Sequence, residues 1–292
     1  METPAEKIKR LQNLPLYDKI ELSLILITKW YEAWDKDVYV SFSGGKDSTV
    51  LLNLARIVDP NIKAIFCNTG LEYPEILKFV RKCDNVTWVK PTKTFKEVIE
   101  HYGYPVVSKD VAQKLMEMRT TKSKKLYNKR LLGANDSYKS GKLPNKWHFL
   151  LYAPFKISEK CCNYLKKQPT KSLGASYIGN TYADSQLRQQ QYLRNGGCGQ
   201  FLSHKPPQSH PLYFWTKKDI WNYLKGFNIS YSSIYDKGWA TTGCMFCMFG
   251  VHLEKEPNRF QKMKILHPKH WEYCIKKLKL SLPLDYMEIP YN

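Results

Sequence analysis

A short apolar strand pattern that runs into a glycine turn and then into a helix pattern constrains this chain most. The stretch reads Tyr39-Val40-Ser41-Phe42-Ser43-Gly44-Gly45-Lys46-Asp47-Ser48-Thr49-Val50-Leu51-Leu52. The backbone N–H groups of such a turn and the positive end of the helix dipole point at one spot, which is the geometry that holds a phosphate. Gly44 and Gly45 permit the backbone conformation and leave no side chain in the way of an anion.

Three side chains of this turn add to the predicted phosphate site. Lys46 supplies a positive charge, and the hydroxyl groups of Ser43 and Ser48 can donate hydrogen bonds. The spacing G-x-x-x-x-G-K-[ST] of a Walker A loop is absent, so this is a phosphate loop of another kind. The competing interpretation is an ordinary strand-to-helix turn whose glycines are there by chance.

Strand and helix patterns alternate along much of the chain. Strand patterns cover residues 38–42, 64–67, 86–89 and 173–179, and helix patterns cover 8–34, 48–58, 73–82 and 95–101. This alternation predicts an α/β fold, a parallel twisted sheet flanked by helices as in Rossmann-like proteins. We expect three segments: N-terminal helices over 1–36, the α/β domain over 37–260, and a C-terminal helix and tail over 261–292.

Composition narrows the class of protein. Hydrophobic residues make up 43% of the 292 residues and aromatic residues 14%, which is enough for a sizeable core. No run of about 18 apolar residues is present, so no membrane partner is expected. Residues 1–10 are charged and polar and lack the apolar centre of a signal peptide. These features predict a cytoplasmic protein.

The formal net charge of +20 is the strongest compositional signal. Such a surface attracts polyanions, either nucleic acid or phosphorylated small molecules, although a lysine-rich bias that merely aids solubility is the competing interpretation. A basic insertion over 110–150 contributes, because residues 114–146 hold ten Lys and Arg against two acids. We expect this insertion to capture phosphates as an arm or lid. A solvated helix face followed by a loop is the alternative.

Four of the eight cysteines form two pairs. Cys161 and Cys162 are adjacent, and Cys244 and Cys247 form a C-x-x-C. A C-x-x-C turn places two thiolates on one side, as in many metal and cluster sites. Adjacent cysteines are unusual in structural zinc sites and are compatible with an iron–sulfur cluster. A zinc site, a redox disulfide and unrelated buried cysteines are the alternatives.

The loop and the cysteine pairs together resemble a known family. The loop matches the SGGxDS signature of the PP-loop ATP pyrophosphatase superfamily. With the Cys-Cys pair and the later C-x-x-C in this order, the chain resembles the phosphoadenylyl-sulfate and adenylyl-sulfate reductase family. The resemblance implies a PP-loop α/β domain with a helical and loop-rich cluster-binding C-terminal part. It also implies a [4Fe-4S] cluster on Cys161, Cys162, Cys244 and Cys247, and ATP or an adenylyl sulfonucleotide on the loop.

Two further segments agree with this resemblance. Residues 68–75, Asn68-Thr69-Gly70-Leu71-Glu72-Tyr73-Pro74-Glu75, are similar to the family segment after the second strand, with Asn68 in place of the usual Asp. Residues 183–188 resemble an arginine segment, which makes Arg188 the expected anion contact. The implied catalytic residues are Lys46, Asp47 and Arg188. The role of Asp47, either ordering the loop or approaching Mg²⁺, is left open. The implied nucleotide-binding residues are Ser43, Gly44, Gly45, Lys46, Asp47, Ser48, Asn68, Gly70 and Arg188.

One feature departs from the family pattern. The family's reductases attack the sulfur of the sulfonucleotide with a cysteine in a C-terminal Glu-Cys-Gly-x-His segment. Residues 280–292 contain no cysteine. Without a mobile thiolate the covalent intermediate of that reaction is not expected to form. Cys198, in a glycine-flanked loop, could take its place, and an incidental loop cysteine is the competing interpretation.

The predicted function is therefore activation of a substrate with ATP for sulfur transfer by a cluster-containing enzyme, with nucleic-acid thiolation or phosphorothioation as candidate reactions. An adenylyl-sulfate or phosphoadenylyl-sulfate reductase is the alternative. A non-catalytic module that binds nucleotide or nucleic acid is the third hypothesis. The expected partners are an adenine nucleotide, a sulfur or electron donor protein and, through the basic insertion, nucleic acid.

Overall fold

A computed structural model describes residues 2–133, 141–204 and 206–292, and the chain divides into two compact units. Unit 1 comprises residues 1–68, 72–90 and 169–242, and unit 2 comprises residues 69–71, 91–168 and 243–292. The predicted segments 1–36, 37–260 and 261–292 follow the order of the chain, whereas the compact units are discontinuous along it. Among the described residues, the structure contains no helix with the length and apolar character needed to span a bilayer.

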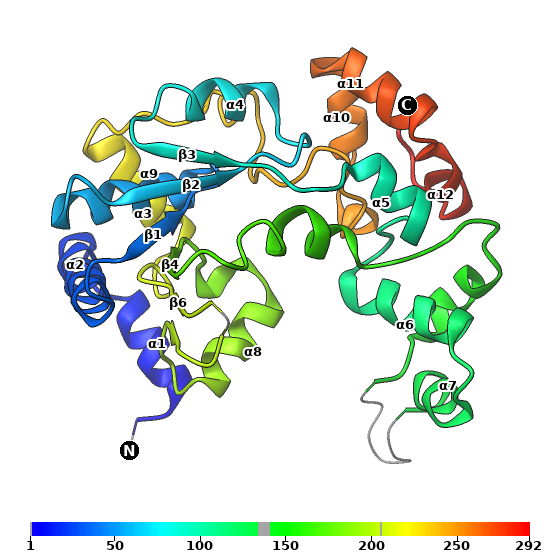
Figure 1. Cartoon of the computed structure of the whole chain (residues 1–292), viewed down its shortest axis with the longest axis horizontal. Coiled ribbons are helices and arrows are strands. Elements are labelled where there is room, and N and C mark those ends of the chain that lie inside the picture. The colour runs from blue at the N-terminus through cyan, green and yellow to red at the C-terminus, as the bar shows by residue number, and fades with distance from the viewer. Residues whose placement is uncertain (1, 134–140, 205) are drawn as a thin grey trace. The chain divides into compact units, whose positions relative to one another are not determined.

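Unit 1 is built on a six-stranded sheet in the order β3-β2-β1-β4-β6-β5 (Figure 1). Neighbouring strands are parallel, except that β5 and β6 are antiparallel. The predicted α/β fold with a parallel sheet is confirmed. β5 and β6 have two residues each, too few for an alternating pattern to show in the sequence. The strands are Val38–Ser41 (β1), Lys63–Cys67 (β2), Val86–Val89 (β3), Ala175–Ile178 (β4), Gln200–Phe201 (β5) and Gln208–Ser209 (β6).

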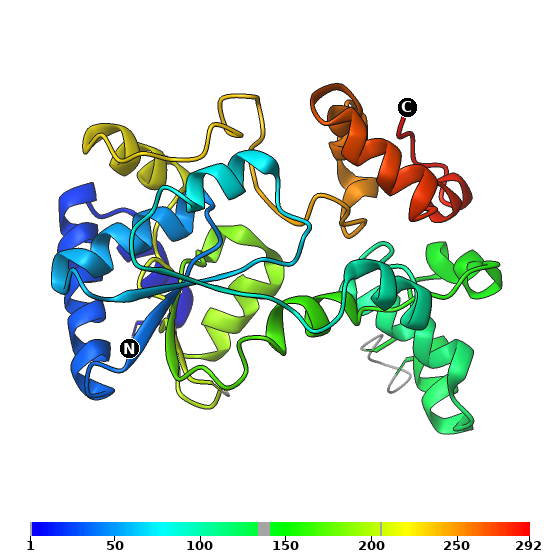
Figure 2. The same ribbon diagram turned by 45° about the horizontal axis from the view of Figure 1, so that its top comes forward.

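Helices flank this sheet (Figure 2). α3 packs against β1 and β4 and also against α2 and α9. A buried ion pair fastens α2 to the start of α9, because the Lys19 ammonium lies 2.7 Å from the Asp219 carboxylate. The helices of unit 1 are Pro4–Gln12 (α1), Leu16–Ala33 (α2), Lys46–Val58 (α3), Pro74–Val80 (α4), Gln186–Arg194 (α8) and Lys217–Gly226 (α9), with a short turn at Tyr182–Asp184 (η3).

Unit 2 consists mainly of short helices. Its only strand-like pairings among the described residues are two isolated bridges, Tyr104 to Ile157 and Val107 to Phe249. Its α-helices are Phe95–Tyr102 (α5), Lys109–Thr120 (α6), Lys124–Leu131 (α7), Arg259–Leu266 (α10), Pro268–Glu272 (α11) and Ser281–Tyr286 (α12). The remaining helical turns are Asn145–Tyr152 (η1), Asn163–Lys167 (η2), Val251–Leu253 (η4) and Tyr273–Lys277 (η5).

The core of unit 1 includes a buried histidine next to β6. His210 is fully buried, and its Nδ1 atom lies 2.7 Å from the hydroxyl of Tyr192. The rings of Tyr192 and Phe201 pack against the imidazole. Burial lowers the pKa of His210 to about 3, so the imidazole is neutral at pH 7.

We expect unit 1 to lose stability in mild acid because of His210. Its folded pKa lies below the unfolded value of about 6.5, so its contribution is fully present above pH 6.5 and is lost as the pH falls toward 3. Lowering the pH from 7 to 5 should cost about 2 kcal/mol of unfolding free energy through this one group. Urea unfolding at several pH values measures it. His210→Gln should flatten the profile, whereas the exposed control His101→Gln should leave it unchanged; equal slopes in both variants would contradict this prediction.

Candidate functional site

The Ser43–Ser48 loop lies at the carboxyl edge of the sheet in unit 1. It follows β1, which pairs with β2 on one side and with β4 on the other. The strand order therefore reverses direction at β1, and in open α/β sheets ligands bind at this point. α3 begins at Lys46 with Gly45 as its N-cap and no side-chain cap, so the loop presents the N-terminus of a helix.

Two hydroxyl groups order the loop from within. The Oγ atoms of Ser43 and Ser48 lie 3.0 Å apart, and the Ser43 N–H donates to Ser48 Oγ over 3.2 Å. Ser48 Oγ also donates to the Gly45 carbonyl over 3.0 Å. In this structure the two serines shape the turn, and a phosphate contact by either hydroxyl stays a prediction.

A distant tyrosine completes the loop. The hydroxyl of Tyr235 accepts the Lys46 backbone N–H over 2.8 Å and lies 3.1 Å from Thr242 Oγ1. These two side chains belong to the segment that leads into the C-x-x-C. Sequence reasoning missed their contact with the loop, because nothing in the pattern of residues 235–242 marks a hydrogen bond to a turn about 190 positions away.

The loop glycines are required by close packing. Gly44 has a φ of +70°, and a Cβ atom there would lie 2.6 Å from Val80 Cγ2 and 2.9 Å from Ile76 Cγ2. Gly179, directly after β4, backs the same loop, because a Cβ atom there would lie 3.1 Å from the Asp47 carbonyl oxygen. The glycines therefore let α4 and the end of β4 approach the turn.

Gly44→Ala is expected to destabilise unit 1 by roughly 2–4 kcal/mol. The left-handed backbone costs about 1–2 kcal/mol for alanine, and the overpacked methyl adds a similar amount. Urea unfolding provides the measurement. Gly226→Ala is the matched control, because no atom lies within 4 Å of a Cβ built at that helix end. We expect the control to be neutral or slightly stabilising; a similar loss in both variants would contradict the packing argument.

Lys46 and Asp47 form an ion pair at the start of α3. Lys46 is only 5% exposed, and its Nζ lies 2.7 and 2.8 Å from the two carboxylate oxygens of Asp47. Burial raises the pKa of Asp47, and the charge of Asp184 raises it further. The Lys46 ammonium lowers this pKa and so partly offsets both effects. The pair keeps the ammonium next to the loop backbone. Asp184 belongs to the segment that resembles the family's arginine segment, so the structure places that segment near the loop.

The remaining predicted nucleotide-binding residues are Asn68, Gly70 and Arg188, which lie outside the Ser43–Ser48 loop. The Asn68 N–H donates to Val89 O over 2.8 Å and extends the β2–β3 ladder at the carboxyl edge. Gly70 has a φ of +76° and belongs to unit 2, whereas Asn68 belongs to unit 1. Arg188 lies on the first turn of α8, where its Nη1 donates to Gln191 Oε1 over 2.8 Å. Within the described residues, no hydrogen bond or ion pair joins Arg188 to the loop.

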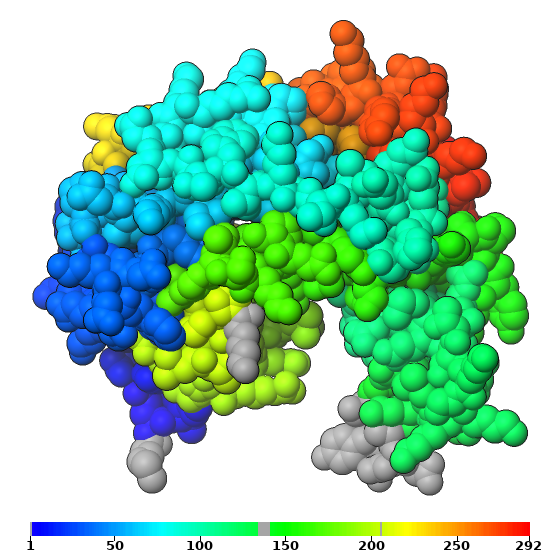
Figure 3. All heavy atoms as spheres, in the orientation of Figure 1, coloured from blue at the N-terminus to red at the C-terminus, as the bar shows by residue number. Residues whose placement is uncertain are grey.

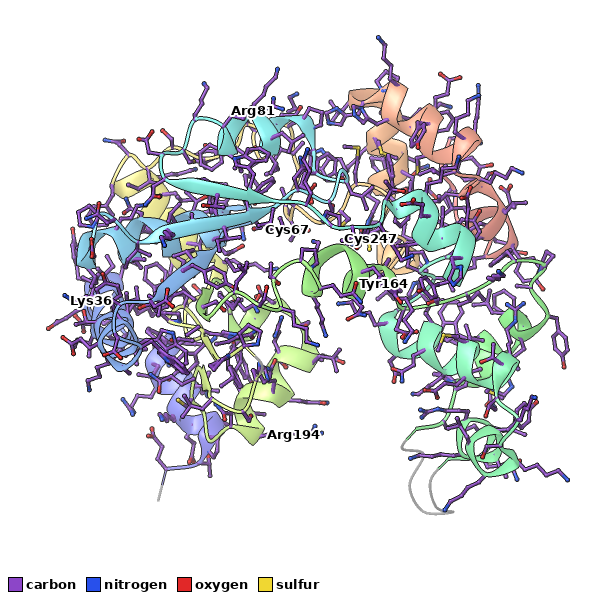
Figure 4. All side chains as sticks on the ribbon, in the orientation of Figure 1. Lys36, Cys67, Arg81, Tyr164, Arg194 and Cys247 are labelled. Atoms are coloured by element: carbon purple, nitrogen blue, oxygen red, sulfur yellow. The ribbon has the colours of Figure 1, made fainter. Side chains whose placement is uncertain are left out.

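The four predicted cluster cysteines lie together in unit 2. Cys161, Cys162, Cys244 and Cys247 line one pocket. Cys247 comes from the C-x-x-C turn and Tyr164 from η2, which follows Cys162 directly, and both are labelled in Figure 4. Apart from Lys166 the rest of the pocket wall is apolar: Leu71, Phe95, Pro105 and Leu165.

A short extended segment brings the two cysteine pairs together. Tyr104 pairs with Ile157, four residues before the Cys-Cys pair, and Val107 pairs with Phe249, two residues after the C-x-x-C. The Gly250 N–H donates to Val107 O over 2.8 Å. Residues 104–107 therefore act as a common strand for both cysteine segments, which are more than 80 positions apart in the sequence.

The thiols lie in a mixed environment of burial and positive charge. The Cys161 thiol donates to Cys162; this bond and burial raise the pKa of Cys161. The same bond, together with the ammonium of Lys109, lowers the pKa of Cys162. Burial raises the pKa of Cys247, an effect that Arg259 partly offsets, and Arg259 Nη1 donates to Cys247 O over 2.9 Å. The site therefore favours a thiolate at Cys162 first.

This donor set fits an iron–sulfur cluster chemically. Cys thiolates are the ligands of [4Fe-4S] clusters, and the apolar wall with nearby cations suits a buried anionic group. Within the described ranges, no three His, Cys, Asp or Glu side chains gather closely enough to ligate a single metal ion. None of the eight cysteines, all of which the structure describes, forms a disulfide.

The sequence of the chain matches the model of one protein family. The model of the phosphoadenosine phosphosulfate reductase domain matches residues 37–131 and 92–249. The chain belongs to the phosphoadenosine phosphosulfate reductase family. The matched residues include the Ser43–Ser48 loop and all four pocket cysteines, so the resemblance based on these motifs is confirmed at the level of the family.

Individual proteins that are similar to this chain share low sequence identity with it. An uncharacterized protein of Methanocaldococcus jannaschii is 25% identical over 279 residues, covering 92% of this chain and 55% of the relative. An adenosine 5'-phosphosulfate reductase of Pseudomonas aeruginosa is 23% identical over 225 residues, which cover 74% of this chain and 68% of that reductase. A phosphoadenylyl-sulfate reductase structure from Candida auris has a TM-score of 0.44 and 15% sequence identity. The match covers 81% of this chain and 93% of the Candida auris chain. The chain spans about half the length of the Methanocaldococcus relatives it matches.

Proposed function

We propose that this chain binds ATP on the Ser43–Ser48 loop and activates an acceptor for sulfur transfer. An oxygen of the acceptor attacks the α-phosphorus of ATP, the bond to pyrophosphate breaks, and an adenylylated acceptor forms. A sulfur anion then attacks the activated carbon or phosphorus, and AMP leaves. Neither step changes an oxidation state. The observation that carries the proposal is the glycine loop at the switch point of the sheet, with Lys46 positioned to stabilise the negative charge that develops on the phosphates.

A [4Fe-4S] cluster on Cys161, Cys162, Cys244 and Cys247 is part of this proposal. When bound, it would supply an iron site that can hold the sulfur to be transferred. The support comes from the donor set, four thiols around one apolar pocket, and from the cations that Lys109 and Lys166 contribute. A sulfur donor protein follows from the same chemistry, because the proposed reaction consumes one sulfur atom in each turnover.

The alternative function is reduction of a sulfonucleotide, the activity named for the Pseudomonas relative. Residues 280–292 contain no cysteine, which disfavours this reaction. The Asn258 amide donates to Pro290 O, and Trp271 Nε1 donates to Tyr291 O over 2.8 Å. These bonds hold the segment against α10 and α11, and Cys274 in η5 is fully buried. Cys198 is the alternative thiol, half-buried in a glycine turn of unit 1, where its Sγ accepts the Gln200 N–H.

Product analysis on anaerobically purified protein separates the two reactions. The protein is incubated with ATP and, in a parallel sample, with adenylyl sulfate, and AMP, pyrophosphate and sulfite are measured. We expect AMP and pyrophosphate from ATP, and exchange of labelled pyrophosphate into ATP. Sulfite from adenylyl sulfate, without ATP cleavage, would overturn the proposal in favour of the reductase. Nucleotide binding without either product would favour a binding module.

A further inference from the structure

The positive charge of the chain is concentrated in unit 2. This unit holds 25 of the 46 Lys and Arg residues but only 11 of the 26 acidic residues. Unit 1, the larger of the two, holds the other 21 basic residues and 15 acids. A polyanionic partner should therefore approach unit 2 first, because unscreened charge sets where such partners associate.

Within unit 2 we call residues 121–133 and 141–152, which overlap the basic insertion, the basic arm. Its centre is α7, Lys124–Leu131, a helix without a single buried residue. Figure 3 shows the atoms of this segment, coloured green, at the surface of unit 2. A helix with no fully buried residue gains little from packing, so its sequence is better explained by what it presents to solvent.

One ion pair attaches this helix to the rest of unit 2. Arg130 Nε lies 2.5 Å from Glu117 Oε2 on α6, and both side chains are largely buried. The Arg130 carbonyl also accepts the Leu143 N–H over 2.7 Å, which ties α7 to the next part of the arm. Glu117 is therefore already paired with Arg130.

Residues 121–133 of the arm hold four lysines that face solvent. All four are exposed, and no ion pair holds any of them within the part of the chain that the structure describes. They lie within eight consecutive positions, so several phosphates of one strand can reach them together. The four are Lys122, Lys124, Lys125 and Lys129.

Exposed aromatic rings lie among these charges. Tyr127 on α7 is 40% exposed, and Phe149 and Tyr152 on η1 are 40% and 84% exposed. The Lys146 ammonium lies 5.2 Å from the centre of the Trp147 ring. Lysines that track a phosphate backbone, combined with rings on which bases stack, are the pattern of proteins that bind single-stranded nucleic acid. Phosphate contacts to a duplex would need the lysines but not the rings.

We propose that the basic arm binds single-stranded nucleic acid, with the phosphates on Lys122, Lys124, Lys125 and Lys129 and a base stacked on Tyr127. Single-stranded nucleic acid would be the acceptor in the proposed reaction, and in this respect the inference rests on the proposed function. Binding itself requires neither ATP nor a cluster. The proposal can therefore be tested by binding alone.

Fluorescence anisotropy with labelled 20-nucleotide strands tests the proposal on the full chain without ATP. RNA, DNA and a DNA duplex are compared over a range of salt concentrations. The variant with all four arm lysines changed to Gln should bind single strands at least tenfold more weakly, and its log–log salt slope should fall by about 3. Tyr127→Ala should weaken binding roughly tenfold. Whichever of the RNA and DNA single strands binds more tightly shows whether the arm prefers ribose or deoxyribose.

A matched control separates the arm from general charge. The variant with Lys63, Lys78, Lys217 and Lys218 of unit 1 changed to Gln removes the same net charge from exposed positions. It should bind within twofold of the natural protein. Equal losses in both quadruple variants, full affinity in Tyr127→Ala, or tighter binding to phosphatidylserine vesicles than to single strands would overturn the proposal. If the arm proves correct but ATP is not cleaved, only the proposed function fails.

Discussion

Replacing Cys247 by serine is expected to abolish cluster binding. The natural chain, purified without oxygen, should contain about four iron and four sulfide ions per molecule and absorb visible light. Cys247→Ser should contain less than about one iron and lose the visible absorption. Iron and sulfide analysis together with the absorption spectrum measure this effect, without any assay of activity.

The expected loss is large because of where Cys247 lies. It is one of four thiol donors around an apolar pocket, and Arg259 holds its backbone in place. A serine hydroxyl is a much poorer iron ligand than a thiolate, and among the residues that the structure describes no carboxylate or imidazole lines the pocket to replace it. Binding free energy of a metal centre is also folding free energy, so unit 2 should unfold at a lower temperature.

Cys83→Ser provides the control for this experiment. Cys83 is half-buried in unit 1, where its thiol donates to Phe79 O over 3.5 Å. Its replacement should leave the iron content unchanged. About one zinc per chain and no sulfide in the natural protein would identify a zinc site instead. Unchanged iron in Cys247→Ser would remove that residue from the ligand set.

Local patterns predicted the elements that position the Ser43–Ser48 loop. The strands at 38–41, 63–67 and 86–89 were visible because each is a short β-branched or apolar run bounded by turn residues. The loop was visible because glycine and serine types are restricted where a helix N-terminus meets a phosphate. Both signals depend on neighbours along the chain.

Contacts between distant segments could not be predicted in this way. Tyr235 reaches the Lys46 N–H, and Lys109 reaches Cys162, across separations that no periodicity records. The same is true of residues 104–107, which join both cysteine segments although they read only as an apolar stretch. Val107 has a φ of +60°, a conformation that β-branched residues rarely adopt, so its sequence gives no sign of it.

Changing Lys46 to alanine is expected to lower ATP cleavage by a factor of about 10²–10³, the effect of removing one preorganised electrostatic contact. The Nζ atom lies within 2.8 Å of both Asp47 oxygens, so the ammonium is held beside the loop before ATP arrives. A group fixed in this way stabilises developing phosphate charge without a cost of reorganisation. Pyrophosphate release measures the rate.

Two companion variants make this prediction specific. Lys78→Ala removes an exposed lysine of α4 and should leave the rate unchanged. Asp47→Asn separates the two roles of that carboxylate: if it orders Lys46, the rate falls at every Mg²⁺ concentration, and if it approaches the metal, more Mg²⁺ restores the rate. Lys46→Ala removes the partner of a half-buried carboxylate, so its thermal unfolding must be measured beside its rate. A folded Lys46→Ala protein that cleaves ATP at the natural rate would show that the reacting nucleotide does not lie on this loop.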